Sequence, residues 1–228
     1  MRQISLCLTH WNRAHMITKA YEKVFADPRI SEIVISDDHS NWTQYLELLK
    51  LRTDRVNVFR NEVNLGVGGN KAKAISLAQS EWAIIFDSDN VLDTDYLDRL
   101  FEIPEWDKDT IYAPTFAKPH FDYRGIGGKT ISRGNVKEYM GNGAFSCFLN
   151  TGNYFVHRDT FGEVYEHVQV KGADSIYIVY LWLKAGKKIV PVPGMHYEHL
   201  VHNGSYYVSV AKESEPLTSY YETLIKEL

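Results

Sequence analysis

The sequence predicts an α/β fold, in which one domain has a mostly parallel central sheet flanked by helices, together with an irregular region in the second half. Three observations support this prediction. Over residues 1–103, short apolar runs alternate with stretches whose apolar residues recur every three or four positions. Polar residues directly follow the apolar runs. Composition is also uneven, because only 10 of the 30 aromatic residues and 3 of the 15 glycines lie in residues 1–103. The two halves are therefore expected to do different jobs.

Strands and helices are expected to alternate through the first half. Each predicted strand is a run of apolar residues, and the helices have apolar residues at four-residue spacing, such as Met16, Ala20 and Val24. The expected order is strand Ile4–Leu8, helix Arg13–Phe25, strand Ser31–Ser36, helix Asn41–Leu51, strand Val56–Phe59, helix Asn70–Gln79, strand Trp82–Phe86 and helix Asp93–Phe101. Strands separated in this way pair in parallel through right-handed crossovers, and ligands bind at their carboxyl ends.

The second half has a weaker pattern. Residues 117–147 are rich in glycine and aromatic residues and are expected to be irregular, which is uncommon in a compact domain unless the segment has a function. Gly186 is a typical helix stop after an apolar helix. The expected elements are strands Ile111–Pro114, Tyr154–His157 and Lys188–Val192, and helices Asp159–Val168, Asp174–Ala185 and Pro216–Leu228.

Charge and cysteine content exclude several classes of protein. Lys and Arg number 25 against 29 Asp and Glu, for a net charge of −4, which argues against a nucleic-acid partner. Cys7 and Cys147 are too few for a disulfide framework, so a reducing compartment, and hence a cytoplasmic location, is expected. No apolar run is long enough for a transmembrane segment. Peripheral membrane contact and the oligomeric state stay open.

The polar residues after the predicted strands are the main candidates for chemistry. Thr9–Arg13 follow the first strand, Asp37–Ser40 the second, and Asp87–Asn90 the fourth. In a parallel sheet these segments meet at one edge. The sequence therefore predicts a site with an aromatic ring, several carboxylates and an arginine at that edge.

Asp87 and Asp89 are the sharpest local feature. Two carboxylates at positions i and i+2 after a strand can reach one divalent cation, and oxygen ligands suit Mg²⁺ or Mn²⁺. An ordinary polar turn is an equally good reading of these residues alone. An EF-hand calcium loop is excluded, because Leu92 stands where its sharp turn needs glycine.

Other candidates also have two readings. Asp37 and Asp38 can accept hydrogen bonds from a base or a sugar, or can belong to a solvated turn before a helix. Trp11 can stack on a planar base or pack in the core. The glycine-rich stretch before Asn70 precedes a helix start that suits phosphate, although it does not match a P-loop.

Asp174 and three histidines complete the candidates. Asp174 begins an apolar helix, where a carboxylate is usually a cap but can also act as a general base. His196, His199 and His202 are spaced by three residues. Zinc often has several histidine ligands, but alternation in an extended segment would not point all three to one face, so one functional histidine is expected.

Taken in order, these motifs resemble an inverting glycosyltransferase of family 2 with the GT-A fold, a Rossmann-like domain. The similarity spans roughly residues 3–204, and several short motifs in order are more specific than any one. The segments that carry it are Leu8–Arg13, Ile35–Ser40 (the Asp-Asp-Gly-Ser turn), Asn64–Ala78 (the Asn-x-Gly stretch), Ile84–Asn90 (the D-x-D segment), Asn150–Asn153, and Gly172–Ser175 (the Glu-Asp motif) with Lys184–Ile189.

The resemblance implies a role for each matching residue. Residues 1–103 would form the nucleotide-binding half and 104–205 the acceptor-binding half of a single domain over 1–228, with 206–228 as a C-terminal helical tail. Asp174 would be the catalytic base, and Mn²⁺ or Mg²⁺ the cofactor. The implied nucleotide-binding residues are Thr9, Trp11, Arg13, Asp37, Asp38, Asn70 and Asp87, the sugar or acceptor residues are Thr151, Gly152, Asn153 and Ala173, and the metal ligands are Asp87, Asp89 and His199.

Two departures from the family pattern bear on this reading. His39 replaces the glycine of the Asp-Asp-Gly-Ser turn, and Ala173 replaces the glutamate of the Glu-Asp motif, which puts the acceptor contacts of that glutamate in doubt. The motif and membrane helices of the processive synthases are missing from the sequence. The resemblance therefore implies transfer of one sugar from a nucleotide sugar to a glycan or other hydroxyl acceptor. UDP is the expected nucleotide, with dTDP and GDP as the alternatives.

Two rival functions use similar features. A nucleotidyltransferase that makes sugar nucleotides would need a basic, glycine-rich loop after the first strand, where this chain has Thr9–Arg13. A non-catalytic carbohydrate-binding module would not need Asp87, Asp89 and Asp174 together. The aromatic second half suggests an acceptor-binding surface, because aromatic faces suit sugar rings, with the candidates Tyr123, Tyr139, Phe145, Phe148 and Tyr154.

Overall fold

A mixed sheet of eight strands forms the centre of the molecule. The computed structural model describes residues 2–200 and 205–228, and the strand order within that part of the chain is β3-β2-β1-β4-β9-β5-β10-β8. The strands are β1 (Ile4–His10), β2 (Ile30–Asp37), β3 (Val56–Arg60), β4 (Trp82–Asp87), β5 (Thr110–Ala113), β8 (Ile131–Ser132), β9 (Phe155–His157) and β10 (Lys188–Pro191). A smaller sheet has the order β11-β6-β7, from β6 (Phe116–Lys118), β7 (Phe121–Asp122) and β11 (His196–Glu198).

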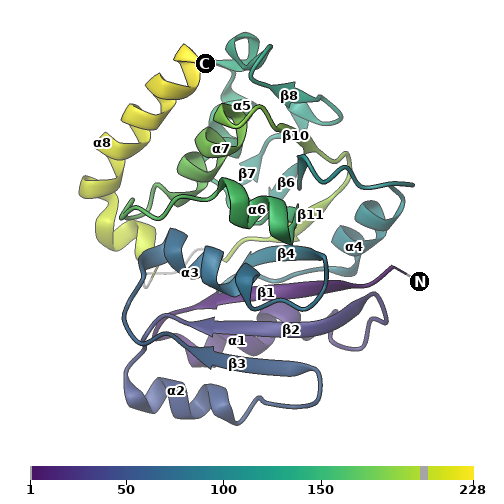
Figure 1. Ribbon diagram of the computed structural model, residues 1–228, viewed down its shortest axis with the longest axis vertical. Coiled ribbons are helices and arrows are strands. Elements are labelled where there is room, and N and C mark those ends of the chain that lie inside the picture. The colour runs from purple at the N-terminus through teal and green to yellow at the C-terminus, as the bar shows by residue number, and fades with distance from the viewer. Residues whose placement is uncertain (1, 201–204) are drawn as a thin grey trace.

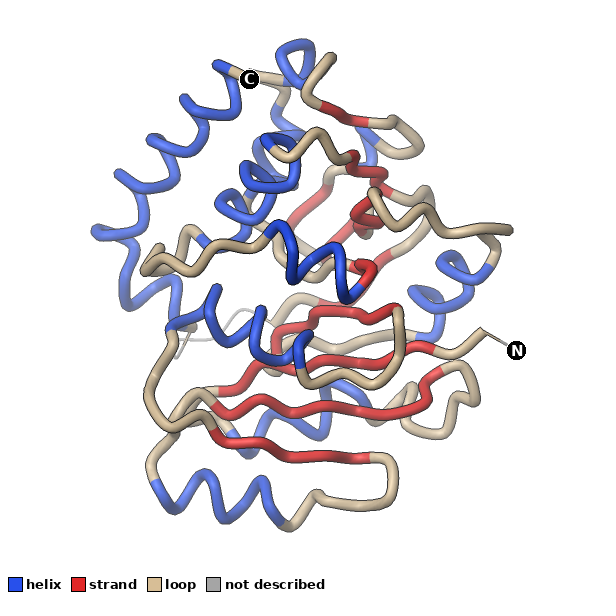
Figure 2. The backbone as a smooth tube through the Cα atoms, viewed as in Figure 1, coloured by secondary structure: helices blue, strands red, loops and turns tan. Residues whose placement is uncertain are grey.

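Helices cover this sheet (Figures 1 and 2), and α3 lies against β1 and β2. They are α1 (Ala14–Tyr21), α2 (Trp42–Leu49), α3 (Gly66–Ser76), α4 (Thr94–Phe101), α5 (Gly143–Leu149), α6 (Arg158–Val164), α7 (Asp174–Lys184) and α8 (Tyr206–Glu227), with short 3₁₀ helices over Arg124–Ile126 and Val136–Tyr139. Among the described helices, none has the length and apolar character needed to cross a membrane.

The fold prediction for the first half is confirmed. Strands β1, β2, β3 and β4 are parallel, and β1 lies between β2 and β4. The chain thus leaves β1 toward β2 and later returns to β4 on its other side. This reversal of strand order is the switch point at which α/β sheets bind ligands. Every residue of β1 is buried, as a strand covered by helices on both faces requires.

The predicted start of the third helix was wrong by four residues. The sequence suggested Asn70–Gln79, because glycine is a poor helix former. In the structure α3 begins at Gly66 and includes Gly68 and Gly69. A methyl group on Gly68 would lie 2.8 Å from Tyr165 Oη, and one on Gly69 would lie 2.6 Å from His167 Cε1. Close packing of residues 165–170 against α3 therefore explains these glycines.

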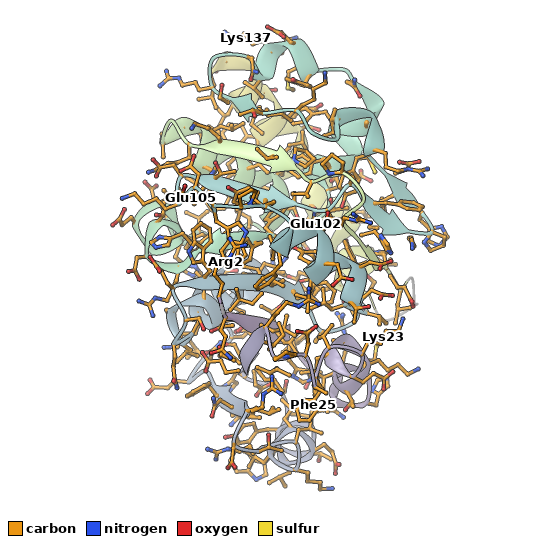
Figure 3. The ribbon with its side chains drawn as sticks, turned by 90° about the vertical axis from the view of Figure 1, so that its right-hand side faces the viewer. Arg2, Lys23, Phe25, Glu102, Glu105 and Lys137 are labelled. Carbon is orange, nitrogen blue, oxygen red and sulfur yellow. The ribbon has the colours of Figure 1, made fainter. Side chains whose placement is uncertain are left out.

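The second half has more regular structure than the sequence predicted. The segment 117–147 contains β7, β8 and the start of α5. The core strand β9 is antiparallel to both β4 and β5, so it joins the two parts of the sheet. In the side view of Figure 3, Lys137 lies at one end of the molecule and Phe25 toward the other. The two halves thus lie along the long axis and meet near β4 and β9.

Two helices of the second half differ from their predicted bounds by several residues. The helix expected at Asp159–Val168 ends at Val164, and His157 caps its start, because its Nδ1 accepts a hydrogen bond from Thr160 N at 3.2 Å. The last helix begins at Tyr206, ten residues before the predicted start at Pro216, which lies inside α8. The helix packs against α7, with the Tyr221 and Tyr177 ring centroids 5.0 Å apart.

The predicted aromatic acceptor surface is wrong. Tyr123, Phe145, Phe148 and Tyr154 are all at most 1% exposed, and Tyr139 packs half-buried against them. Their rings form one cluster, with centroids about 6 Å apart for the Tyr123–Phe148, Phe145–Phe148 and Phe148–Tyr154 pairs. These rings of the second half therefore build a hydrophobic core.

Candidate functional site

A cavity of about 1380 Å³ opens at the carboxyl ends of β1, β2 and β4. Its position is the predicted one, at the switch point between β1 and β4, where Thr9 Oγ1 donates a hydrogen bond to Asp87 Oδ1 at 3.3 Å. Both halves of the chain contribute to its wall. Among the predicted site residues, those on the wall are Thr9, Trp11, Arg13, Asp38, Asn70, Asp87, Asp89, Thr151, Gly152, Asp174 and His199.

The turn after β1 is held by His10, which is buried. Its Nε2 accepts a hydrogen bond from Arg13 N at 3.0 Å, so this nitrogen carries no proton and Nδ1 donates to Asp37 Oδ1 at 3.0 Å. Asn12 N donates to Ser40 Oγ at 2.8 Å and joins this turn to the turn after β2. The network leaves the Trp11 side chain 42% exposed on the cavity wall.

The prediction that Asp37 contacts a nucleotide does not fit its surroundings. Its side chain is fully buried and does not line the cavity. The carboxylate is held by His10, by the Ser40 hydroxyl and, at 3.5 Å, by Arg60 Nε. Asp37 therefore holds the turns after β1 and β2 in place from the buried side.

Asp38 does lie on the cavity wall. Its Oδ1 accepts hydrogen bonds from Leu65 N at 2.7 Å and from Asn61 Nδ2 at 3.1 Å. Burial raises the pKa of this carboxyl, and the hydrogen bonds only partly oppose the effect. Asp38 is thus a rigidly held acceptor that the fold keeps at a cost in stability when it is ionised.

The next residue explains the departure of this turn from the family pattern. His39 has a φ of +59°, in the left-handed region that glycine adopts most easily. Its Nδ1 lies 3.1 Å from Asn61 O. The turn keeps its backbone shape with histidine in place of glycine.

Asn70 also has a mainly structural place. Its Oδ1 accepts from Ser36 Oγ at 2.7 Å and from Asn61 Nδ2 at 3.0 Å, and its Nδ2 donates to Ser36 O at 3.0 Å and, at 3.5 Å, to His10 O. These bonds use all hydrogen-bonding capacity of the amide. The geometry therefore does not support the predicted contact with a nucleotide, although Asn70 lies on the wall.

The carboxylates of the D-x-D segment both face cations of the protein. Asp87 Oδ1 lies 3.1 Å from Lys71 Nζ, and Asp89 pairs with Arg13. The backbone of Asp87 is fixed because its N–H donates to Asn153 Oδ1 at 2.8 Å. The predicted residue Asn153 is 1% exposed and off the wall, so it positions Asp87 and does not reach a sugar.

Lys71 is the group that sequence analysis missed. Its Nζ donates to Asp174 Oδ2 at 2.7 Å while also facing Asp87, and the residue is 1% exposed. Burial opposes the positive charge, but the carboxylates of Asp174 and Asp87 outweigh it and raise the pKa of Lys71 above its usual value. A signal was present, because Lys71 precedes Ala74 and Ala78 at helical spacing on the buried face.

Asp174 was expected either to cap its helix or to act as a general base. It is the first residue of α7, and its carboxylate reaches the cavity instead of capping the helix. Ala173 is 2% exposed and does not line the cavity, so the predicted acceptor contact of this residue is not supported. Gly152 and Ser175 stand beside the pair of Asp174 and Lys71.

The three histidines differ in position. His199 lies on the cavity wall, where its ring packs edge-on to Phe121 with centroids 4.8 Å apart. His196 faces elsewhere, with Nδ1 3.0 Å from Gly194 O and Nε2 3.3 Å from Asp95. His202 lies outside the described residues. Within residues 2–200 and 205–228, no three His, Cys, Asp or Glu side chains gather closely enough to hold a metal ion by themselves.

Aromatic rings that sequence analysis did not select also line the cavity. They are Phe121, Tyr197 and Tyr206, and Tyr206 meets Trp11 edge-on with centroids 6.2 Å apart. Tyr206 comes from α8, which adds Val208, Glu215, Thr218 and Ser219 to the wall. These residues lie far from the motifs in sequence and approach the cavity through the packing of α8 on α7.

Comparison with known proteins identifies relatives of this architecture. Residues 5–164 match the family model for glycosyl transferase family 2. The fold is similar to TarS of S. aureus in complex with UDP-GlcNAc, with a TM-score of 0.71 and 15% identity over 99% of this chain and 71% of that one. No curated protein matches the sequence significantly.

Two further solved structures share the fold. A mannosyltransferase from Pyrobaculum calidifontis in complex with GDP-Man and Mn²⁺ has a TM-score of 0.65 and 14% identity, over 99% of this chain and 70% of that one. GalNAc-T7 with UDP, GalNAc and Mn²⁺ has a TM-score of 0.67 and 18% identity, over 93% of this chain and 48% of that one. The GT-A fold expected from the motifs is thereby confirmed.

Proposed function

The chain belongs to glycosyltransferase family 2, and we propose that it transfers a single sugar from a UDP-sugar to an acceptor hydroxyl with inversion at the anomeric carbon. One observation carries the proposal: a single cavity is lined by Asp87 and Asp89, at the end of β4, and by Asp174, at the start of α7. This arrangement has separate carboxylates for a donor diphosphate and for an acceptor.

The donor would lie over the first half. Trp11 is an exposed aromatic ring for stacking on a base, and Asp38 is a fixed acceptor for a base N–H. Thr9 and Arg13 line the same cavity and contact the D-x-D segment, Thr9 at Asp87 and Arg13 at Asp89. The similar structures of TarS with UDP-GlcNAc and GalNAc-T7 with UDP favour uracil as the base.

A divalent metal ion, Mn²⁺ or Mg²⁺, fits the donor set. Asp87 and Asp89 offer carboxylate oxygens and His199 an imidazole on the same cavity wall. A preformed cluster of three protein ligands is unnecessary, because Mg²⁺ is commonly held by one or two carboxylates plus substrate phosphates. When bound, the ion would neutralise negative charge on the leaving diphosphate. Two of the similar structures contain Mn²⁺.

On the acceptor side, Asp174 would act as general base. Its carboxylate takes the proton of the acceptor hydroxyl as the acceptor oxygen forms a bond to the anomeric carbon. The bond between that carbon and the diphosphate oxygen breaks, and its electron pair leaves with the nucleoside diphosphate. Because attack comes from the face opposite the leaving group, a single displacement inverts the anomeric centre.

A donor screen tests the function. UDP-, GDP- and dTDP-sugars are incubated with the protein and Mn²⁺, and release of nucleoside diphosphate is followed with and without a panel of glycoside acceptors. Release of UDP from a UDP-sugar, stimulated by an acceptor, is the expected result. Binding without turnover would instead favour a carbohydrate-binding module, and release of pyrophosphate from a sugar phosphate and UTP would favour a nucleotidyltransferase.

The product tests the mechanism. NMR of the anomeric proton is expected to show the opposite configuration from the donor, and mass spectrometry a product one sugar longer than the acceptor. A retained configuration would contradict the role of Asp174 as base in a single displacement. Extension by many sugars per encounter would contradict single transfer.

A further inference from the structure

We infer that Lys71 is a positioning residue for this reaction, whose ammonium group holds Asp174 at a fixed place relative to Asp87. The acceptor-activating carboxylate and the donor-side carboxylate would then keep one spacing, because a single buried cation contacts both. The inference rests on the proposed function and assigns a role to a residue for which the resemblance implied none.

The contacts join three elements that are distant in sequence. Lys71 comes from α3, Asp87 from the end of β4, and Asp174 from the start of α7. The Nζ atom lies 2.7 Å from Asp174 Oδ2 and 3.1 Å from Asp87 Oδ1. Ionised hydrogen bonds of these lengths are directional and strong. Of the two Asp174 oxygens, Lys71 engages Oδ2, which directs an acceptor proton to Oδ1.

Gly152 leaves just enough space for the Lys71 ammonium. A methyl group at Gly152 would lie 2.8 Å from Lys71 Nζ and 2.6 Å from Ser175 Oγ, so a residue with a side chain at 152 would displace one or both groups. On the other side, the glycines of α3 allow residues 165–170 to pack closely and bring α7 to its place. Glycine at 152 is therefore needed for the position of the ammonium itself.

Stability alone is a poor reason for such an arrangement. Buried ion pairs commonly contribute little net stability compared with apolar residues of similar volume, because the desolvation of the charges is costly. Here the cation lies on the cavity wall, beside the groups proposed to act on donor and acceptor. A positioning role explains why a charge is kept at this place.

A double-mutant cycle tests the inference with a donor identified by the screen above. If Lys71 acts through Asp174, Lys71→Met should lower kcat at least ~10-fold and leave the KM for the donor within about threefold of the wild type. The double variant, Lys71→Met with Asp174→Asn, should then be no slower than Asp174→Asn alone. Multiplicative effects of the two substitutions would overturn the inference, since they would mean independent action.

Gly152→Ala provides a second route that leaves both charges in place. It should lower kcat as Lys71→Met does, with KM for the donor and affinity for UDP, measured by tryptophan fluorescence, changed less than threefold. The matched control is Gly162→Ala on α6, where a methyl group meets nothing within 4 Å, and its kcat should equal that of the wild type. Circular dichroism verifies folding, and Gly152→Ala keeps the test valid if Lys71→Met fails to fold.

The outcomes separate the two proposals. A folded wild type that turns over no sugar nucleotide would contradict the proposed function and, with it, the role of Lys71. An active wild type whose kcat is unchanged by Gly152→Ala, or by a folded Lys71→Met, would overturn the inference about Lys71 and leave the proposed function intact.

Discussion

The two halves of the chain build one cavity in different ways. The first half supplies it from short turns after parallel strands, where His10, Asp37 and Asn70 form a buried network that fixes the exposed groups. The second half supplies it from a helix start, from β11 and from α8, which reach the wall only through tertiary packing. In the first half, the cavity residues are therefore close together in sequence. In the second half, residues distant in sequence meet at the cavity only after the chain has folded.

Aromatic residues show the difference most directly. In the first half, Trp11 lies on the wall and is exposed, while in the second half Phe148 is fully buried at the centre of a ring cluster. The same type of side chain thus lies on the cavity wall in one place and in the core in the other.

The largest effect is expected in that core. Phe148→Ala should reduce the free energy of unfolding by about 3–5 kcal/mol, because it removes a large buried side chain and leaves a cavity. Urea denaturation measures the change. Phe121→Ala is the comparison, since this half-buried ring lies on the cavity wall and should cost less. If Phe148→Ala were as stable as the wild type, Phe148 would not be a core residue and would again be a candidate for binding the acceptor.

Trp11→Ala should weaken nucleotide binding and leave the stability of the fold unchanged. Loss of a stacking surface for the base is expected to weaken UDP binding by about 1–3 kcal/mol, or roughly 5- to 150-fold. Isothermal titration calorimetry measures the affinity. Trp42→Ala removes a ring that is 60% exposed and off the cavity wall, and it should leave the affinity unchanged. If both variants bind UDP like the wild type, the base does not stack on Trp11.

The first half could be predicted from sequence because its signals are local. Apolar runs set the strands, and the turn residues follow them directly, so Asp38, Asp87 and Asp89 were expected at the sheet edge where the cavity opens, and they lie on its wall. Lys71 was missed because its partner Asp174 is over a hundred residues away and only the docking of α7 on α3 joins them. Burial of the second-half aromatic rings likewise depends on which faces pack together, and composition alone does not show this.

His39 tests the local shape of the turn after β2. A branched side chain is strained at a φ of +59°, so His39→Val should lower the free energy of unfolding by about 1–2 kcal/mol. His39→Gly relieves the strain, so its free energy of unfolding should exceed that of His39→Val by at least this amount. His15→Val on the exposed surface of α1 is the control, and thermal denaturation compares all three. A His39→Val variant as stable as the control would show that the turn does not need the left-handed conformation.

The smallest effect is a dependence of stability on pH at Asp38. The folded state raises the pKa of this carboxyl, so it binds the proton more tightly than the unfolded chain does. This contribution favours folding at low pH and is lost as the pH rises through the raised pKa. Asp38→Asn keeps an oxygen for both bonds that Oδ1 accepts, and it should be more stable than the wild type at pH 7.

Denaturation at a series of pH values measures this difference, which should shrink as the pH falls through the raised pKa and be gone below the ordinary pKa of a carboxyl. UDP affinity of the variant should fall if Asp38 accepts from the base. A stability difference that grows toward acid would contradict the direction assigned to the pKa.

The most direct test of the account compares two aspartates that each lie in the first turn of a helix. Asp174 begins α7 on the cavity wall, and Asp159 lies exposed at the start of α6, beside Arg158. We predict that Asp174→Asn lowers the kcat of sugar transfer about 10²- to 10⁴-fold, with UDP affinity within twofold of the wild type, whereas Asp159→Asn leaves both unchanged. Wild-type turnover by Asp174→Asn would contradict the proposed mechanism.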